Sequence, residues 1–175
     1  MQIPLERIKS IGRKLGLDDE KGYIIAILLA LIIVASIVAV YFVVYRPQPE
    51  PYSTIYILDD QKQAANYAQT LVAGENSTFN VWVNVENHMG GSGNQSYQVL
   101  VKIAQNPSTY PVEVKPIYTY QISLADGGKW QNLTPITENQ VGSYSVVFEL
   151  WLYNSESSAY EFTHNFCDLN IQVIS

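Results

Sequence analysis

A stretch of 23 residues without a charged side chain, residues 23–45, constrains this chain more than any other feature. As an α-helix rising 1.5 Å per residue it is about 34 Å long, against about 30 Å of hydrocarbon in a bilayer. Fifteen of the 23 residues are Leu, Ile, Val or Phe, and Ser36 is the only polar residue besides the tyrosines. The stretch therefore predicts a single transmembrane helix.

The charges on either side of this helix predict its orientation. Five basic residues precede it, whereas only Arg46 and Lys62 follow within a comparable distance. Because basic side chains favour the cytoplasmic side, we expect residues 1–22 to form a basic, amphipathic cytoplasmic segment. The remainder of the chain then lies outside the cell. The residues expected at the membrane interfaces are Tyr23, Tyr41, Tyr45, Lys21 and Arg46.

Three acceptor sequences for N-glycosylation lie on the predicted exterior side, at Asn76, Asn94 and Asn132. Such sequences arise easily by chance in a chain rich in Asn and Ser. They agree with the orientation but do not establish it.

Two other interpretations of the apolar segment stay open. A cleaved secretory signal has an apolar core of about 7–15 residues, which favours an uncleaved anchor for a segment this long. Lys21-Gly22 directly before an apolar helix also resembles the cleavage site of archaeal type IV prepilins, although three acidic residues crowd it. Cleavage after Gly22 would make the chain a pilin-like or filament-anchoring subunit.

The charge balance excludes one class of partner. Sixteen acidic against ten basic residues give a net charge of −6, so binding to the phosphates of nucleic acid is excluded. The single Cys allows neither an intramolecular disulfide nor a zinc site built on several thiolates. The fold must therefore depend on its hydrophobic core.

The residues after the helix predict a spacer and then a β domain. Proline alternates with other residues in the spacer, residues 46–52, which favours an extended conformation. From residue 53 to residue 175, apolar and polar residues alternate in short segments, the pattern of half-buried strands. We expect strands over residues 55–58, 79–86, 97–103, 118–124, 144–152 and 167–173, and a short one near Val112.

Short strands at regular spacing, without a second helical pattern, favour an antiparallel β-sandwich. The predicted architecture is therefore mainly β: a single N-terminal transmembrane helix followed by an immunoglobulin- or fibronectin-like sandwich over residues 53–175.

Three motifs in this order resemble the exterior domain of the archaeal membrane proteins called DUF1616. They are Tyr56-Ile-Leu through Gly74-Glu, Val83-Asn-Val-Glu-Asn-His-Met-Gly90 and Phe148-Glu-Leu-Trp-Leu-Tyr153, and the resemblance covers about residues 53–174. It departs from the family in having one membrane helix rather than several, and in Met89, where an acidic residue is expected. The family has no established activity, so the resemblance implies a fold and a surface location.

The sequence offers little chemistry. It contains two His, one Cys and no convergent set of catalytic residues, so we expect neither an enzyme nor a cofactor. A remote alternative is a cupredoxin-like copper site formed by His88, His164 and Cys167. The order of these residues departs from that of blue-copper proteins, which disfavours the alternative.

We expect a binding protein instead. The candidate binding-loop residues are His88, Met89, Asp126 and Trp130, in a domain rich in Tyr, Asn and Ser, which suit adaptable contact surfaces. The predicted role is a non-catalytic binding or structural subunit of a cell-envelope or membrane complex. The expected partners are the lipid bilayer and other envelope or membrane proteins or glycans, with an oligomer possible and nucleic acid excluded.

Overall fold

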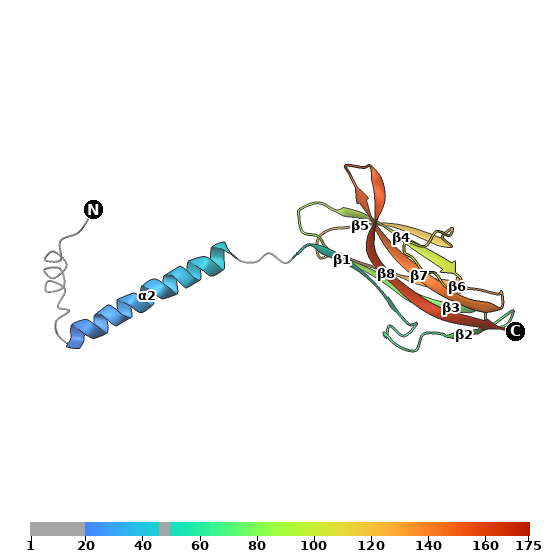
Figure 1. Cartoon of the computed structure of the whole chain (residues 1–175), viewed down its shortest axis with the longest axis horizontal. Coiled ribbons are helices and arrows are strands. Elements are labelled where there is room, and N and C mark those ends of the chain that lie inside the picture. Colours follow the sequence, from blue (N-terminus) through green and yellow to red (C-terminus); the bar gives the residue numbers. More distant parts are fainter. Residues whose placement is uncertain (1–19, 46–49) are drawn as a thin grey trace. The chain divides into compact units, whose positions relative to one another are not determined.

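The computed structural model describes residues 20–45 and 50–175, which belong to two separate units (Figure 1). The first holds the helix α2, Glu20–Val44, and the second is a β domain that begins at Glu50. Most of the expected cytoplasmic segment, the side chain of Lys21, and Arg46 with the following three spacer residues lie outside the described residues.

Helix α2 is apolar on every side. Residues Gly22–Val44 have a mean hydropathy of 3.1. The hydroxyl of Ser36 donates a hydrogen bond to the carbonyl of Ile32 at 2.7 Å, so it leaves no unpaired donor on the apolar surface. The helix is long and apolar enough to cross a membrane, as the sequence predicts, and a signal sequence can have the same properties.

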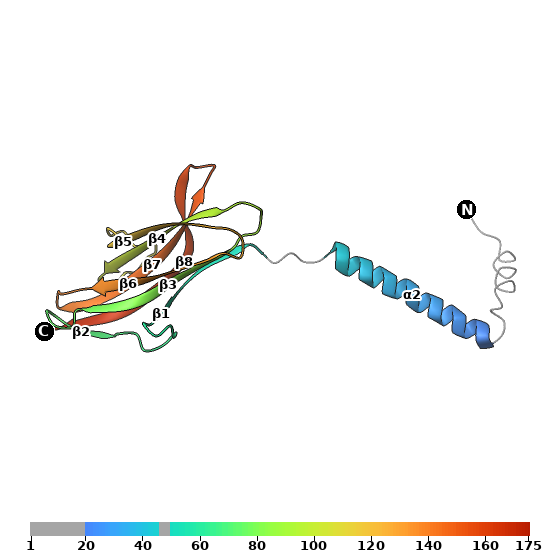
Figure 2. The same ribbon diagram turned by 180° about the vertical axis from the view of Figure 1, so that it is seen from behind.

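The β domain contains eight strands in two sheets, shown from opposite sides in Figures 1 and 2. One sheet has the order β1-β3-β6 and the other the order β2-β8-β7-β4-β5. All neighbouring strands are antiparallel except β2 and β8, which are parallel. The strands are β1 (Tyr52–Leu58), β2 (Thr70–Val72), β3 (Thr78–His88), β4 (Gln95–Ala104), β5 (Tyr118–Leu124), β6 (Lys129–Thr137), β7 (Gly142–Asn154) and β8 (Ala159–Ile174).

This strand order is that of an immunoglobulin-like sandwich. The first, third and sixth strands form one layer, while the fourth, seventh and eighth form the centre of the other. The predicted fold class is confirmed.

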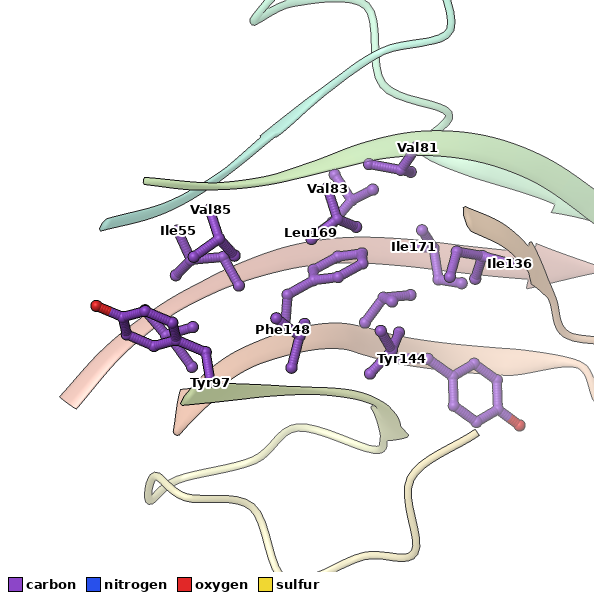
Figure 3. Packing of buried hydrophobic residues seen from close by; sticks show 14 of the residues in the cluster. Ile55, Val81, Val83, Val85, Tyr97, Ile136, Tyr144, Phe148, Leu169 and Ile171 are labelled. Carbon is purple, nitrogen blue, oxygen red and sulfur yellow. The ribbon is translucent and has the colours of Figure 1, made fainter. Parts of the chain in front are cut away.

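The core lies between the two sheets and follows from the alternation in the sequence. Val81, Val83 and Val85 point inward from β3 and are fully buried, opposite Phe148 of β7. Figure 3 shows these side chains interleaved with Tyr97 and with residues of β8. Burial of this apolar surface is the main source of stability in a domain without a disulfide.

Three expectations about the strands are wrong in detail. Val112 lies in a connection between strands, not in a strand. Two strands, β2 and β6, were not predicted, and β8 begins at Ala159, well before the expected start at residue 167. Pro135 lies within β6, which is tolerated because β6 is an edge strand.

The core predicts a clear contrast between two phenylalanines. Phe148→Ala should lower the free energy of unfolding by about 3–5 kcal/mol, because it leaves a cavity between the sheets. Phe166 is 38% exposed, so Phe166→Ala should lower the free energy of unfolding by no more than about 1.5 kcal/mol. Urea unfolding of the full-length chain in detergent, followed by tryptophan fluorescence, measures both. Equal losses would contradict the described core.

Candidate functional site

A buried ion pair lies on the outer face of the five-stranded sheet. Glu149 of β7 is fully buried, and its Oε2 accepts a hydrogen bond from Lys102 Nζ of β4 at 2.8 Å. The indole N–H of Trp151 also donates to Glu149 Oε2, at 3.1 Å. A buried charge is costly unless it is paired and hydrogen-bonded, and here the carboxylate has both kinds of partner.

This ion pair holds the connection between β4 and β5 against the sheet. The backbone N–H of Val112 donates to Glu149 Oε1 at 2.6 Å, and its carbonyl accepts from Lys102 Nζ at 2.6 Å. Val112 thereby packs against Ala104 and Val147 in a second, smaller hydrophobic cluster. Val112 is buried although it is not in a strand, because two charged side chains satisfy its backbone.

A row of aromatic rings lies beside this cluster. Tyr110, from the same connection, stacks on Phe166 of β8 with ring centroids 3.9 Å apart. Phe166 lies 6.4 Å from Phe162, which lies 5.6 Å from Trp151. Tyr153 and Tyr160 continue the row two residues along β7 and β8, with centroids 5.4 Å apart. We call these six residues the aromatic face.

The aromatic face is partly open to solvent, and five of its six residues lie on a projecting hairpin. Tyr153 and Phe166 are 41% and 38% exposed, and the other four residues are half-buried. The β7–β8 hairpin, orange to red in Figure 1, extends past the neighbouring strands. An open pocket of about 300 Å³ lies at this hairpin, and its lining includes Tyr153, Asn154, Glu161 and Phe162.

An irregularity in β8 explains why the hairpin leaves the sheet. Glu149 is opposite Phe166 but Trp151 is opposite Phe162, so β8 has two extra residues between these pairs. His164 adopts φ +62° there, and the Thr163 hydroxyl donates to the carbonyl of Leu150 at 2.8 Å. Bulges increase the local twist and bend a strand, which turns the hairpin out of the sheet.

The expected binding loops come together at another place, the end of the sandwich where β1 begins. His88 stacks on Tyr52 with centroids 4.7 Å apart. The N–H of Gly90 donates to Asp126 Oδ1 at 2.9 Å and so ties the loop that contains Met89 to the next turn. Trp130 does not join this group, because it packs against the core from β6, 5.3 Å from the ring of Tyr120.

Asn87 fixes these loops from inside the domain. It is fully buried, its amide donates to the carbonyl of Leu124 at 2.9 Å, and its Oδ1 accepts from the Tyr97 hydroxyl at 2.8 Å. The N–H of Met89 also donates to this oxygen, at 3.0 Å. The side chains of Asn87 and Asp126 are therefore used in holding the loops together.

The three residues of the copper alternative are not arranged as ligands. In the described part of the chain, no three His, Cys, Asp or Glu side chains come together in a way that suits a metal ion. The thiol of Cys167 donates to the carbonyl of Ile55 at 3.3 Å. Burial, together with the charge of Asp168, raises the pKa of this thiol to about 11, which disfavours the thiolate that binds metals.

The three glycosylation candidates differ in access. Asn76 and Asn94 are exposed beside turns. Asn132 is half-buried in β6, and its amide donates to the carbonyl of Leu133 and to the Thr134 hydroxyl. Access for a glycosylating enzyme is therefore better at the first two sites.

The tyrosines expected at the membrane interfaces lie at the two ends of α2. Tyr23 is near the start of the helix, and Tyr45 directly follows its last residue. Tyr41 and Tyr45 stack with centroids 5.2 Å apart. Their positions fit the prediction without testing it.

Sequence reasoning missed the aromatic face. Its residues come from three segments, and Phe162 and Phe166 lie on either side of the bulge, which breaks the alternation that marks a strand. The spacing of Trp151 and Tyr153 on one face of β7 was the one available signal.

The buried ion pair predicts strongly non-additive mutations. Lys102→Met or Glu149→Gln alone should cost about 3–5 kcal/mol of stability, because each leaves an unpaired or poorly paired group inside the domain. The double variant should cost clearly less than the sum, since no buried charge remains. A double-mutant cycle on urea unfolding measures this coupling, and additivity within about 0.5 kcal/mol would contradict it.

Glu86 predicts a pH dependence near the β1 edge. Hydrogen bonds from Lys129, then His88 and Tyr56, hold the pKa of its carboxyl at about 2, below the ordinary 4.5. Its contribution to stability is therefore present above pH 4.5 and is lost as the pH falls toward 2. The difference in stability between wild type and Glu86→Gln should shrink over this window.

The effect at Glu86 should be sensitive to salt, because the Lys129 side chain is 66% exposed. In a Lys129→Met background the Glu86→Gln difference should be smaller at every pH above 4.5. A difference that stays constant from pH 5 to pH 2 would contradict the lowered pKa.

Comparison with solved structures found domains of similar architecture at low sequence identity. The crystal structure of the CARDB domain of the PF1109 protein from Pyrococcus furiosus, in complex with di-metal ions, has a TM-score of 0.47 and 16% identity, covering 72% of this chain and 90% of that one. The solution structure of the same domain has a TM-score of 0.47 and 18% identity, covering 73% and 98%. A β-glucosidase from Listeria innocua in complex with glucose has a TM-score of 0.38 and 11% identity, covering 71% of this chain and 16% of that one.

Comparison with curated proteins found no match. A family model does match, over residues 46–168, which is more than half of the chain and includes the whole three-stranded sheet, the aromatic face and both buried polar networks. The resemblance seen in the sequence is thereby confirmed, and this chain belongs to the family described as Domain of unknown function (DUF1616).

Proposed function

We propose that this chain is a single-pass, membrane-anchored protein whose exterior β-sandwich acts as a non-catalytic binding or structural subunit of a cell-envelope or membrane complex. The N-terminus is cytoplasmic and the sandwich is outside, in accordance with the distribution of basic residues. The bilayer is one partner, through α2, and an envelope or membrane protein or glycan is the other.

The observation that carries the proposal is the aromatic face. Six aromatic residues lie side by side, five on the β7–β8 hairpin and Tyr110 on the β4–β5 connection. Tyr and Trp are enriched at the centres of interfaces, because they bury a large area with few rotatable bonds. Asn154 and Glu161 line the adjacent pocket, where the Asn154 amide donates to Glu161 Oε1 at 3.0 Å.

The buried ion pair supports this role by ordering the surface before binding. Trp151 is held by its N–H to Glu149, and Tyr110 is held by the connection that Lys102 and Glu149 bind. A surface that is already ordered loses less conformational entropy when it binds. The polar groups around Glu149 all bond within the domain. Their role in this proposal is to hold the surface in place, and they take no part in catalysis.

Site-specific photocrosslinking of the full-length protein in its own membranes tests the proposal. A photoreactive phenylalanine analogue at Tyr153 or Phe166 should give crosslinks to one and the same partner. Tyr56, which is 37% exposed on the outer face of the three-stranded sheet, is the matched control and should give none. Equal crosslinking from all three positions, or none from Tyr153 and Phe166, would contradict the assignment of the aromatic face.

The same preparation distinguishes the anchor from the filament alternative. The intact mass should correspond to a chain that retains residues 1–22. A chain that begins at Tyr23 would instead indicate prepilin-type processing after Gly22 and a pilin-like or filament-anchoring role.

A further inference from the structure

The two sheets have four edge strands, and three of them are protected. β2 has only three residues, and β6 carries Pro135. β1 is longer, but side chains occupy its outward carbonyls: Asn165 donates to Ser53, Cys167 to Ile55 and Tyr67 to Ile57. These are recognised ways of preventing an edge from pairing with another chain.

The fourth edge, β5, has no such protection. No side chain or backbone group in the described residues hydrogen-bonds to the outward backbone groups of residues 118–123. The strand, Tyr-Thr-Tyr-Gln-Ile-Ser-Leu, contains no charged residue, Gly or Pro. Tyr, Thr and Ile all favour strands. An open, uncharged edge of this length is a template for pairing.

Several side chains of β5 that face the core are also incompletely buried. Tyr118, Tyr120 and Ile122 face the core but are only half-buried, and Ile117, just before the strand, is 44% exposed. A further strand beside β5 would cover these residues. Thr119, Gln121 and Ser123 face outward and present no charge to a partner.

We propose that β5 pairs in antiparallel fashion with β5 of a second copy of this chain, joining two five-stranded sheets into one. The nearest charges on either side of the strand favour this partner, since Lys115 precedes β5 and Asp126 follows it. Antiparallel pairing brings the Lys115 end of one strand to the Asp126 end of the other, whereas parallel pairing brings like charges together. A two-fold contact of this kind is closed and does not propagate.

With Gln121 of one copy opposite Gln121 of the other, core-side residues of the two strands lie opposite core-side residues, and outer residues lie opposite outer residues. Tyr118 then lies opposite Leu124 and Tyr120 opposite Ile122, so apolar residues stay on the core side. Thr119 lies opposite Ser123 on the outer side. The aromatic face lies on β7, β8 and the β4–β5 connection, so this contact does not depend on what that face binds.

The antiparallel arrangement has a consequence for anchored copies, which rests on the membrane anchoring proposed above. Tyr52, where the chain enters the sandwich, is paired with His88 at the same end of the domain as Leu124. Two copies paired through β5 therefore have their N-terminal ends at opposite ends of the joined sheet. This geometry suits contact between copies in facing membranes.

Disulfide trapping of the full-length protein tests the pairing. In a Cys167→Ser background, Gln121→Cys should form a disulfide-linked dimer on mild oxidation, because the two-fold axis places residue 121 of each copy opposite itself. Thr119→Cys is the matched control. Its two copies lie about 14 Å apart along the strands in this register, at roughly 3.4 Å per residue, so it should not self-link.

Two further variants make the test decisive. Thr119→Cys with Ser123→Cys should restore linking, and Gln121→Lys should leave the protein monomeric in light scattering, because two lysines then meet on the axis. Equal linking by Gln121→Cys and Thr119→Cys, or a wild-type monomer throughout, would overturn the self-pairing.

Vesicles reconstituted with the full-length chain, sandwich outward, test the facing-membrane geometry separately. Wild type should cluster vesicles, and Gln121→Lys should not. Disulfide-linked dimers without vesicle clustering would overturn the facing-membrane contact while leaving the pairing of β5 in place. Loss of the aromatic-face crosslinks would bear on the proposed function alone.

Discussion

The carboxylate of Glu149 is the point on which the outer face of the five-stranded sheet depends. It is fully buried, and three donors satisfy it: the ammonium of Lys102, the N–H of Val112 and the indole of Trp151. Each donor belongs to a different part of the surface: β4, the β4–β5 connection and the aromatic face. One charged group thus determines the positions of three segments, and its removal disturbs all of them together.

Asn87 has the same function at the end of the sandwich where β1 begins. Its side chain joins β3, the end of β5, the loop at Met89 and the hydroxyl of Tyr97. A domain with one Cys and no metal cluster in its described residues holds its loops by buried hydrogen bonds, where small secreted domains often use disulfides. Such bonds are strong only when every group is satisfied, and the described residues contain no buried side-chain N or O atom without a partner.

Sequence patterns predicted most of the sandwich because its core strands alternate regularly. β3, β4, β5 and β7 follow from residues such as Val83 and Phe148 at every second position. β6 was missed because its inward positions include Asn132 and Thr134, which do not mark a buried face, and because Pro135 argues against a strand. Val112 was expected in a strand because it is apolar, but it lies in a connection. Its burial depends on hydrogen bonds from its backbone to Lys102 and Glu149, which are distant in the sequence.

The candidate site was less predictable for a related physical reason. The motifs that carry the family resemblance contain Asn87 and Glu149, whose roles are internal and depend on partners that alternation does not identify. The loops near His88 and Asp126 come together, and the N–H groups of Met89 and Gly90 are occupied within them. The aromatic face depends on the bulge at His164, a three-dimensional feature that brings Phe162 and Phe166 beside β7 while interrupting the pattern of β8.

The low charge of the domain determines how its strand edges are protected. Charged residues are the commonest protection of strand edges, and a chain with few of them must use other means. β1 uses side-chain donors on its carbonyls and β6 uses a proline, and neither device adds charge to the surface. β5 itself carries no charged residue, Gly or Pro, and the nearest charges on either side of it are Lys115 and Asp126. An edge of this kind is a template for pairing, and a second copy of β5 complements it in length, in the faces of its side chains and in the nearest flanking charges.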